Sequence, residues 1–194
     1  MSAQEIIAQA VEEHHPRLVL ACSFQKEESV LIDMLMGIEP RGRVFTIDTG
    51  VLFPETYAVW RTIEERYGLP IEVQDAAGPW TADHCCGEQK VAALERALEG
   101  AGAWITGIRR EQGPTRANAQ HVERDERRGI WKFNPLADWS ERDVWQYIHE
   151  HDLPYNPLHD RGYASIGCAP CTSPGSGREG RWAGQAKTEC GLHV

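Results

Sequence analysis

Segments with the hydrophobic pattern of a buried strand alternate with segments that have the pattern of a helix through more than half of the chain. The expected strands span residues 17–24, 42–48, 69–75 and 103–108, and the expected helices span 29–36, 54–68 and 90–98. Strands separated by helices pair in parallel, are covered by helices on both faces and are joined by right-handed crossovers. The alternation therefore predicts an α/β fold with a parallel, twisted sheet.

Two further helices are expected outside this alternation. Ser2 and Glu5 have the spacing of a capping box at the start of an N-terminal amphipathic helix, and Ser140 is placed to cap a helix over 140–152. The segment from Gly113 to Gly129 is polar and charged, and we assign no strand or helix to it.

The length and composition indicate one globular unit. A chain of 194 residues, 41% of them hydrophobic, has the usual size of one domain and can build a core. The stretch from Thr172 to Gly184 is rich in Gly, Ser and Pro. We therefore predict a domain over residues 1–171 and a mobile tail over 172–194.

Charge and hydropathy narrow the classes of partner. A net charge of −9 disfavours a polymeric nucleic acid, because phosphate backbones are bound by Lys and Arg. The N-terminus has acidic residues and no secretory signal pattern, and no apolar run is long enough to cross a bilayer. We expect a cytoplasmic protein with no membrane partner, and the sequence leaves open whether it forms a homo-oligomer.

Four of the six cysteines form two short groups. Cys85 and Cys86 are adjacent, and Cys168 and Cys171 form a C-A-P-C motif. Clustered cysteines in a reducing compartment more often bind metal than form disulfides, so we favour one site with thiolate ligands. The spacing allows either a tetrahedral zinc or an iron–sulfur cluster. Cys22 has no partner nearby in sequence, and we expect it to pack in the core.

Cys190 differs from the other cysteines because it follows a glycine-rich tract close to the end of the chain. A terminal cysteine alone is usually incidental. However, His193 lies three residues further on and could support thiolate formation or stabilise a bound anion.

Polar and basic side chains follow the expected strands, at the edge where α/β sheets bind ligands. The candidate substrate-binding residues there are Ser23, Phe24, Asp48, Thr49, Gly50, Gly107, Arg109 and Arg116. Lys90, Arg178 and Arg181 add cationic groups, and the planar fork of arginine suits phosphate and sulfate. Each of these cations alone is typical of a solvated surface, but together they indicate an oxyanion site. The loop SFQKEES occupies the position where nucleotide-binding α/β proteins present a helix N-terminus to phosphate.

Eight segments carry a family resemblance, and they occur in the order SFQKEESVLID, TIDTGVLFPET, CCGEQKV, WITGIRREQGPTR, KFNPLADWSERDVWQYI, YNPLHDRGYASIGCAPC, REGRW and KTECGLH. Together they resemble the assimilatory adenylyl-sulfate and phosphoadenylyl-sulfate reductases over nearly the whole chain from Ala21 onward. The resemblance implies a fold like that of the adenine-nucleotide alpha hydrolases. Their ATP-cleaving members typically carry SGGxDS where this chain has SFQKEES, so ATP cleavage is not expected.

The resemblance also implies roles for particular residues. It makes Cys190 the nucleophile that takes the sulfonyl group from adenylyl sulfate, giving AMP and then sulfite with thioredoxin as reductant. It implies one [4Fe-4S] cluster per chain, held by Cys85, Cys86, Cys168 and Cys171. It implies a phosphosulfate site formed by Lys90, Arg178, Arg181 and His193, with Ser23, residues 48–50 and Arg109 binding the nucleotide. The 3′-phosphorylated nucleotide is the alternative substrate.

Two alternatives from other classes remain. An ATP-dependent nucleotide-activating enzyme, such as a tRNA-thiolation protein, would cleave ATP and would need a basic RNA-binding surface. A non-catalytic, zinc-stabilised nucleotide-binding module would contain zinc and would give Cys190 no function.

Overall fold

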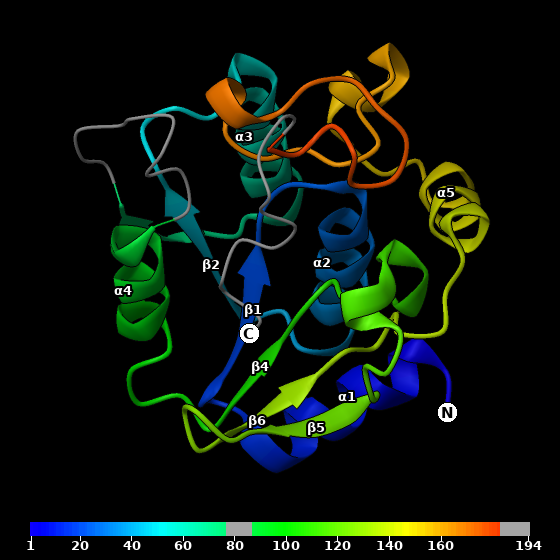
Figure 1. Ribbon diagram of the computed structural model, residues 1–194. Coiled ribbons are helices and arrows are strands. Elements are labelled where there is room, and N and C mark those ends of the chain that lie inside the picture. Colours follow the sequence, from blue (N-terminus) through cyan, green and yellow to red (C-terminus); the bar gives the residue numbers. More distant parts are fainter. Residues whose placement is uncertain (77–86, 183–194) are drawn as a thin grey trace.

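The computed structural model describes residues 1–76 and 87–182, and its centre is a six-stranded sheet of order β3-β2-β1-β4-β6-β5 (Figure 1). The strands are β1 (Leu18–Cys22), β2 (Arg43–Asp48), β3 (Glu72–Asp75), β4 (Ala103–Ile105), β5 (Val122–Asp125) and β6 (Ile130–Phe133). Neighbouring strands are parallel except for the antiparallel pair β5–β6. The predicted α/β class with a mostly parallel sheet is confirmed.

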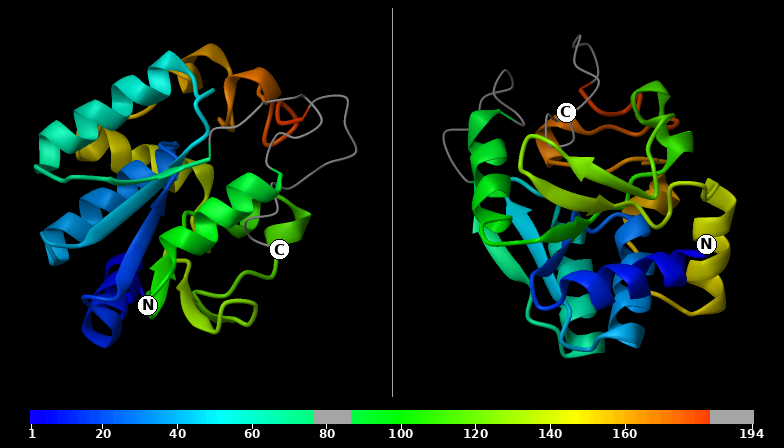
Figure 2. Two further views of the ribbon diagram at one scale, coloured as in Figure 1. Left: turned by 90° about the vertical axis from the view of Figure 1, so that its left-hand side faces the viewer. Right: turned by 90° about the horizontal axis from the view of Figure 1, so that it is seen from below.

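Helices cover both faces of the sheet (Figure 2). They are α1 (Ala3–His14), α2 (Lys26–Ile38), α3 (Pro54–Tyr67), α4 (Glu88–Ala97) and α5 (Glu141–Glu150). The larger core lies between the sheet and α1, α2, α3 and α5, whereas α4 packs on the opposite face over Val19, Phe45 and Trp104. The expected capping box at Ser2 and the expected cap at Ser140 are present, and Ser140 forms a capping box with Asp143. No helix in the described parts of the chain is both long and apolar enough to span a membrane.

Two elements differ from the sequence-based expectation. The hairpin β5–β6 lies in and just after the polar segment to which no element was assigned, and it adds the antiparallel edge of the sheet. Helix α2 begins at Lys26, three residues before the predicted start, because Gln25 and Glu28 form a capping box around its first turn. The charged residues Lys26, Glu27 and Glu28 are therefore buried helical residues.

The described part of the expected tail, residues 172–182, is folded against the rest of the domain. Thr172 and Arg181 form a β-bridge, and the side chain of Trp182 is 2% exposed. Gly180 is required there, because a Cβ at this position would overlap the carbonyl oxygen of Ser173. This stretch therefore differs from the mobile tail that its composition suggested, and residues 183–194 lie outside the described residues.

Candidate functional site

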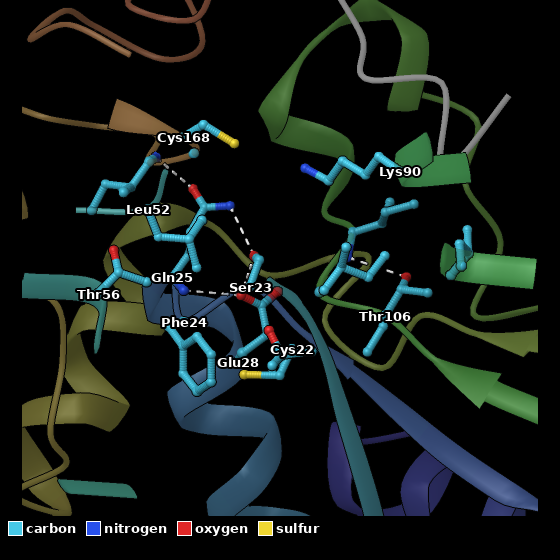
Figure 3. A pocket seen from close by; sticks show the side chains of 18 of the residues that line it. Cys22, Ser23, Phe24, Gln25, Glu28, Leu52, Thr56, Lys90, Thr106 and Cys168 are labelled. Atoms are coloured by element: carbon cyan, nitrogen blue, oxygen red, sulfur yellow. Dashed lines mark hydrogen bonds between the residues drawn. The ribbon is translucent and has the colours of Figure 1, made fainter. Parts of the chain in front are cut away.

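A pocket opens at the carboxyl ends of β1, β2 and β4 (Figure 3). Strand β1 pairs with β2 on one side and with β4 on the other, so the order of strand addition reverses beside it. Open α/β sheets bind ligands at such a switch point, outside the carboxyl ends of the strands. The topology therefore places the pocket where a nucleotide-binding site is expected.

Cationic side chains reach this pocket from three parts of the chain. Lys90 comes from α4, Arg116 from the loops after β4, and Arg178 and Arg181 from the segment after the C-A-P-C motif. Figure 3 shows the Lys90 side chain pointing into the pocket. Among the described lining residues, Glu28 is the single acidic side chain. This balance of charge favours an anionic ligand.

Arg181 is a buried cation in the pocket wall. Its side chain is 8% exposed, and its Nη1 donates to the carbonyl oxygen of Ile166 (3.3 Å) and to Ser165 Oγ (3.4 Å). Its Nε is buried and has no hydrogen-bond acceptor within the described residues. A buried guanidinium normally needs an ionic or hydrogen-bonding partner on each side. Arg181 Nε can therefore donate a hydrogen bond to an oxyanion in the pocket.

The start of α2 and the loop before it are hydrogen-bonded to the segment that leads to Cys168. The side chain of Gln25 accepts a hydrogen bond from the Ile166 amide (2.8 Å). The ammonium group of Lys26 donates to the carbonyl oxygen of Ala164 (2.9 Å) and lies 3.5 Å from a carboxylate oxygen of Glu141. These contacts hold the first strand–helix loop and the C-terminal loops together as one pocket wall.

Glu28 and its neighbour Glu27 have different partners although both are buried. Glu27 Oε1 accepts from Arg109 Nε at 2.9 Å in a buried ion pair. Glu28 Oε2 instead accepts from Ser23 Oγ (2.9 Å) and the Gln25 amide (3.1 Å). Burial, and then the charge of Glu27, raise the pKa of Glu28 to about 7.

The two described cysteines of the expected cluster lie beside the pocket. Cys168 caps the start of a 3₁₀ turn, Ala169–Cys171, and Cys171 ends it, while Cys168 also lines the pocket. The Cys168 sulfur lies 3.2 Å from Thr49 Oγ1, and the Trp182 amide donates to the carbonyl oxygen of Cys171 (3.0 Å). A C-x-x-C pair on one turn is a spacing that metal-binding thiolates use, so these two residues fit the expected donor set. Cys85 and Cys86 lie outside the described residues.

Comparison with known proteins identifies the family of the chain. The family model described as "Phosphoadenosine phosphosulfate reductase domain" matches residues 17–174. The chain belongs to this family. A Gloeobacter violaceus protein named phosphoadenosine 5′-phosphosulfate reductase is 46% identical, with 100% of this chain and 89% of the relative aligned. A Geobacillus kaustophilus protein named adenosine 5′-phosphosulfate reductase is 43% identical, with 99% and 90% aligned.

A solved structure supports the same assignment. The phosphoadenylyl-sulfate reductase of Candida auris, in a phosphate complex, matches with a TM-score of 0.76 and 30% identity. The match covers 89% of this chain and 91% of that structure. The family expected from the sequence is therefore confirmed, and the two curated relatives carry names for two different nucleotides.

Only some of the substrate-binding residues expected for this reductase family line the pocket. The lining includes Ser23, Phe24, Gly107 and Arg116. Phe24 has a left-handed backbone (φ 58°), and its buried ring stacks on Trp60 with centroids 5.1 Å apart. This conformation is costly for a residue other than glycine, and such strain is concentrated at functional sites.

Asp48, Thr49, Gly50 and Arg109 do not line the pocket. Asp48 Oδ1 accepts from the Gly50 amide (2.8 Å) and from Tyr57 Oη (2.7 Å), while Thr49 contacts Cys168. Burial and then the hydrogen bond to Asp48 raise the pKa of Tyr57 to about 12. Arg109 is 3% exposed and contacts Glu27 and Glu111, because the chain after β4 turns it toward α2. Cys190 and His193 lie outside the described residues.

Several lining residues of the pocket were not singled out from the sequence as binding residues, among them Gln25, Glu28 and Thr106. Gln25 and Glu28 belong to the loop SFQKEES, which marked a phosphate-binding position without distinguishing its members. Cys22 is buried at 5% exposure, as expected for a packing cysteine, and it also lies in the pocket lining. The signal for the two loop residues was their place immediately after a buried strand.

Proposed function

We propose that this chain is a cytoplasmic oxidoreductase of sulfate assimilation that reduces adenylyl sulfate to sulfite and AMP with electrons from reduced thioredoxin. The observation that carries the proposal is the group of four cations around one pocket at the carboxyl ends of β1 and β4, including the buried Arg181. The names of the curated relatives support a nucleotide-linked sulfate as the ligand.

Binding is the first step of the proposed mechanism. The negative oxygens of the phosphosulfate must be neutralised before an anionic nucleophile can approach the sulfur. Lys90 supplies positive charge from α4, and Arg178 and Arg181 supply it from the segment after the C-A-P-C motif. Such preorganised electrostatic stabilisation is usually the largest single contribution to catalysis. His193 would contribute a further donor.

The thiolate of Cys190 then attacks the sulfur of the bound nucleotide. A bond forms between the cysteine sulfur and the sulfonyl sulfur, and the bond from that sulfur to the phosphate oxygen breaks. AMP departs with the electron pair, and Cys190 carries an S-sulfonate.

A thioredoxin thiolate completes the reaction by attacking the sulfur of Cys190. Sulfite leaves with the electron pair of the broken S–S bond, and a mixed disulfide joins the two proteins. The second thioredoxin thiol resolves this disulfide and restores the Cys190 thiolate. The two electrons that reduce the sulfonyl group come from the oxidation of the thioredoxin dithiol.

Cys85, Cys86, Cys168 and Cys171 would hold one [4Fe-4S] cluster, which would polarise the neighbouring site without cycling electrons because the dithiol supplies both. The placement of Cys168 in the pocket lining is consistent with a cluster beside the substrate. Cys171, at 8% exposure, and Trp182 enclose the same region.

A side-by-side measurement of sulfite release tests the proposal. Iron-replete protein with reduced thioredoxin should release sulfite from adenylyl sulfate. The 3′-phosphorylated nucleotide is the second candidate, because the 46% identical relative is named for it. Absence of sulfite from both nucleotides would remove the proposal.

Two controls address the other classes of function. ATP cleavage to AMP and pyrophosphate would indicate a nucleotide-activating enzyme. Zinc in place of iron and sulfide, measured on anaerobically purified protein, would indicate the non-catalytic module.

A further inference from the structure

The carboxyl group of Glu28 occupies a central place in the pocket wall. Its side chain is 7% exposed and lies between the end of β1 and the end of β4. Oε2 accepts from Ser23 Oγ and the Gln25 amide, and Figure 3 shows Glu28 next to Ser23. Oε1 lies against Gly107, since a Cβ there would overlap it. A buried carboxyl group therefore borders the space that the proposed function gives to an anionic nucleotide.

The local partners of Glu28 do not neutralise a negative charge. The guanidinium group of Arg109 pairs with the neighbouring Glu27 at 2.9 Å, and Gln112 also donates to Glu27 (3.2 Å). No ion pair to Glu28 exists among the described residues. Of these two adjacent buried carboxyl groups, Glu27 is paired with a guanidinium and Glu28 is not paired with one among the described residues, so Glu28 has the stronger tendency to hold a proton.

The groups that face Glu28 come from several elements. Glu27 precedes it on α2, and the negative charge of Glu27 disfavours a negative charge on Glu28. Cys22 lies buried on β1, and burial raises the pKa of its thiol well above the ordinary value, so it is a neutral neighbour. The cations that line the same pocket act in the opposite sense: Lys90, Arg116, Arg178 and Arg181. An anionic ligand pairs with these cations, which then offset less of a negative charge on Glu28. The ligand also adds its own negative charge beside the carboxyl group. Its entry therefore favours the protonated form of Glu28.

We propose that Glu28 takes up a proton from solvent when an anionic nucleotide enters the pocket and then faces the ligand as a neutral carboxylic acid. The identity of the ligand rests on the proposed function. In this neutral form the group can donate a hydrogen bond to a ligand oxygen, whereas an ionised carboxylate would repel it. Glu28 is thus a proton-linked binding residue of the reductase pocket.

The sign of the pH dependence follows from this linkage. The pKa of Glu28 in the unliganded protein is raised to about 7, and a bound anion raises it further. Below pH 7 the group is already protonated, so affinity changes little with pH. Above pH 7 each binding event takes up a proton, and the dissociation constant rises by up to about tenfold per pH unit until the pKa of the complex is passed.

Calorimetric titration with AMP tests the proposal. Binding is measured between pH 7.5 and 9 in two buffers of different ionisation enthalpy, which counts the protons taken up. Wild-type protein should take up a large fraction of one proton, approaching one near pH 8. Glu28→Gln should take up none and should bind AMP with a dissociation constant nearly independent of pH over this range. The matched control Glu65→Gln, at an exposed position of α3, should behave like wild type.

The outcomes separate two kinds of failure. AMP binding by wild-type protein without proton uptake, or equal uptake by Glu28→Gln, would overturn the role of Glu28 while leaving the proposed function intact. No binding of AMP or adenylyl sulfate at any pH would overturn the proposed function and this role with it. The proton count of the wild-type protein does not depend on any variant, so a folding defect in Glu28→Gln would not obscure the result.

Discussion

The guanidinium group of Arg181 lies against the backbone of Gly167, in the space that a side chain at position 167 would occupy. A Cβ there would come 2.9 Å from Arg181 Nε and would overlap Cζ and Nη2. Both residues line the pocket. The absence of a side chain at Gly167 is therefore what leaves room for a buried cation in the pocket wall.

Gly167→Ala should displace Arg181 and raise the KM for adenylyl sulfate by about tenfold or more, because a hydrogen bond to a charged group contributes about 1.5–3 kcal/mol. The measurement is steady-state sulfite release. Gly37→Ala is the control, since a Cβ at Gly37 meets nothing within 4 Å, and its KM should not change. An unchanged KM in Gly167→Ala would show that Arg181 does not contact the substrate.

Arg109→Leu should lower the free energy of unfolding by about 3–5 kcal/mol, because it leaves Glu27 buried without its partner. The double variant Glu27→Leu/Arg109→Leu should recover a large part of that loss in urea unfolding. Arg161→Leu, which removes an exposed ion pair to Glu55, should cost less than about 1 kcal/mol. Loss of nucleotide affinity without loss of stability would instead make Arg109 a substrate ligand.

Glu28 should make the stability of the unliganded protein depend on pH. Its pKa is about 7 in the folded state against an ordinary value of 4.5, so the folded state holds its proton more tightly than the unfolded state. This contribution is fully present below pH 4.5 and is lost as the pH rises through 7, by about 3 kcal/mol in total. The difference in unfolding free energy between wild type and Glu28→Gln, measured from pH 5 to 8.5, should follow this curve. A constant difference would contradict it.

Cys190→Ser should form no protein-bound sulfonate when incubated with adenylyl sulfate, whereas wild-type protein without reductant should gain one sulfonate group by intact mass. Iron content should be the same in both proteins, because Cys190 is outside the expected donor set. A sulfonate adduct on Cys190→Ser would place the nucleophile elsewhere.

Cys171→Ser should lose iron, sulfide and the broad visible absorption of the cluster. Cys22→Ala serves as the control, since Cys22 is buried on β1 and does not belong to either cysteine group. It should retain the iron of the wild-type protein. Wild-type iron content in Cys171→Ser would show that Cys171 is not a ligand of the cluster.

Sequence patterns identified the central strands because these are apolar on both sides. They missed β5 and β6, whose chain Val122–Phe133 is rich in charged residues and carries the 40% exposed Trp131. A strand at the edge of a sheet with little apolar alternation gives a weak signal. The hairpin is stabilised by a cross-strand ion pair between Lys132 and Glu123, 3.0 Å apart, which hydrophobic periodicity does not reveal.

Two expectations near the site also differ from the structure, because composition alone does not show which polar or glycine residues pack against distant parts of the chain. Charged residues usually lie in solvent, so Lys26–Glu28 was assigned to a loop, whereas long-range partners bury all three. Glycine-rich sequence suggested mobility after Thr172, but within that stretch Gly180 is needed for close packing against Ser173. Composition does not distinguish a glycine that allows movement from one that allows close approach.

The burial of Trp182 also limits where the proposed nucleophile can go. Cys190 follows this anchor by eight residues, and a fully extended chain advances at most about 3.6 Å per residue, so the sulfur stays within about 30 Å of it. If Cys190 is the nucleophile of the proposed function, its sulfur is covalently linked to the same chain that binds the nucleotide, so its attack is an intramolecular step. The rate of sulfonate formation on bound nucleotide should then not change with the concentration of the protein.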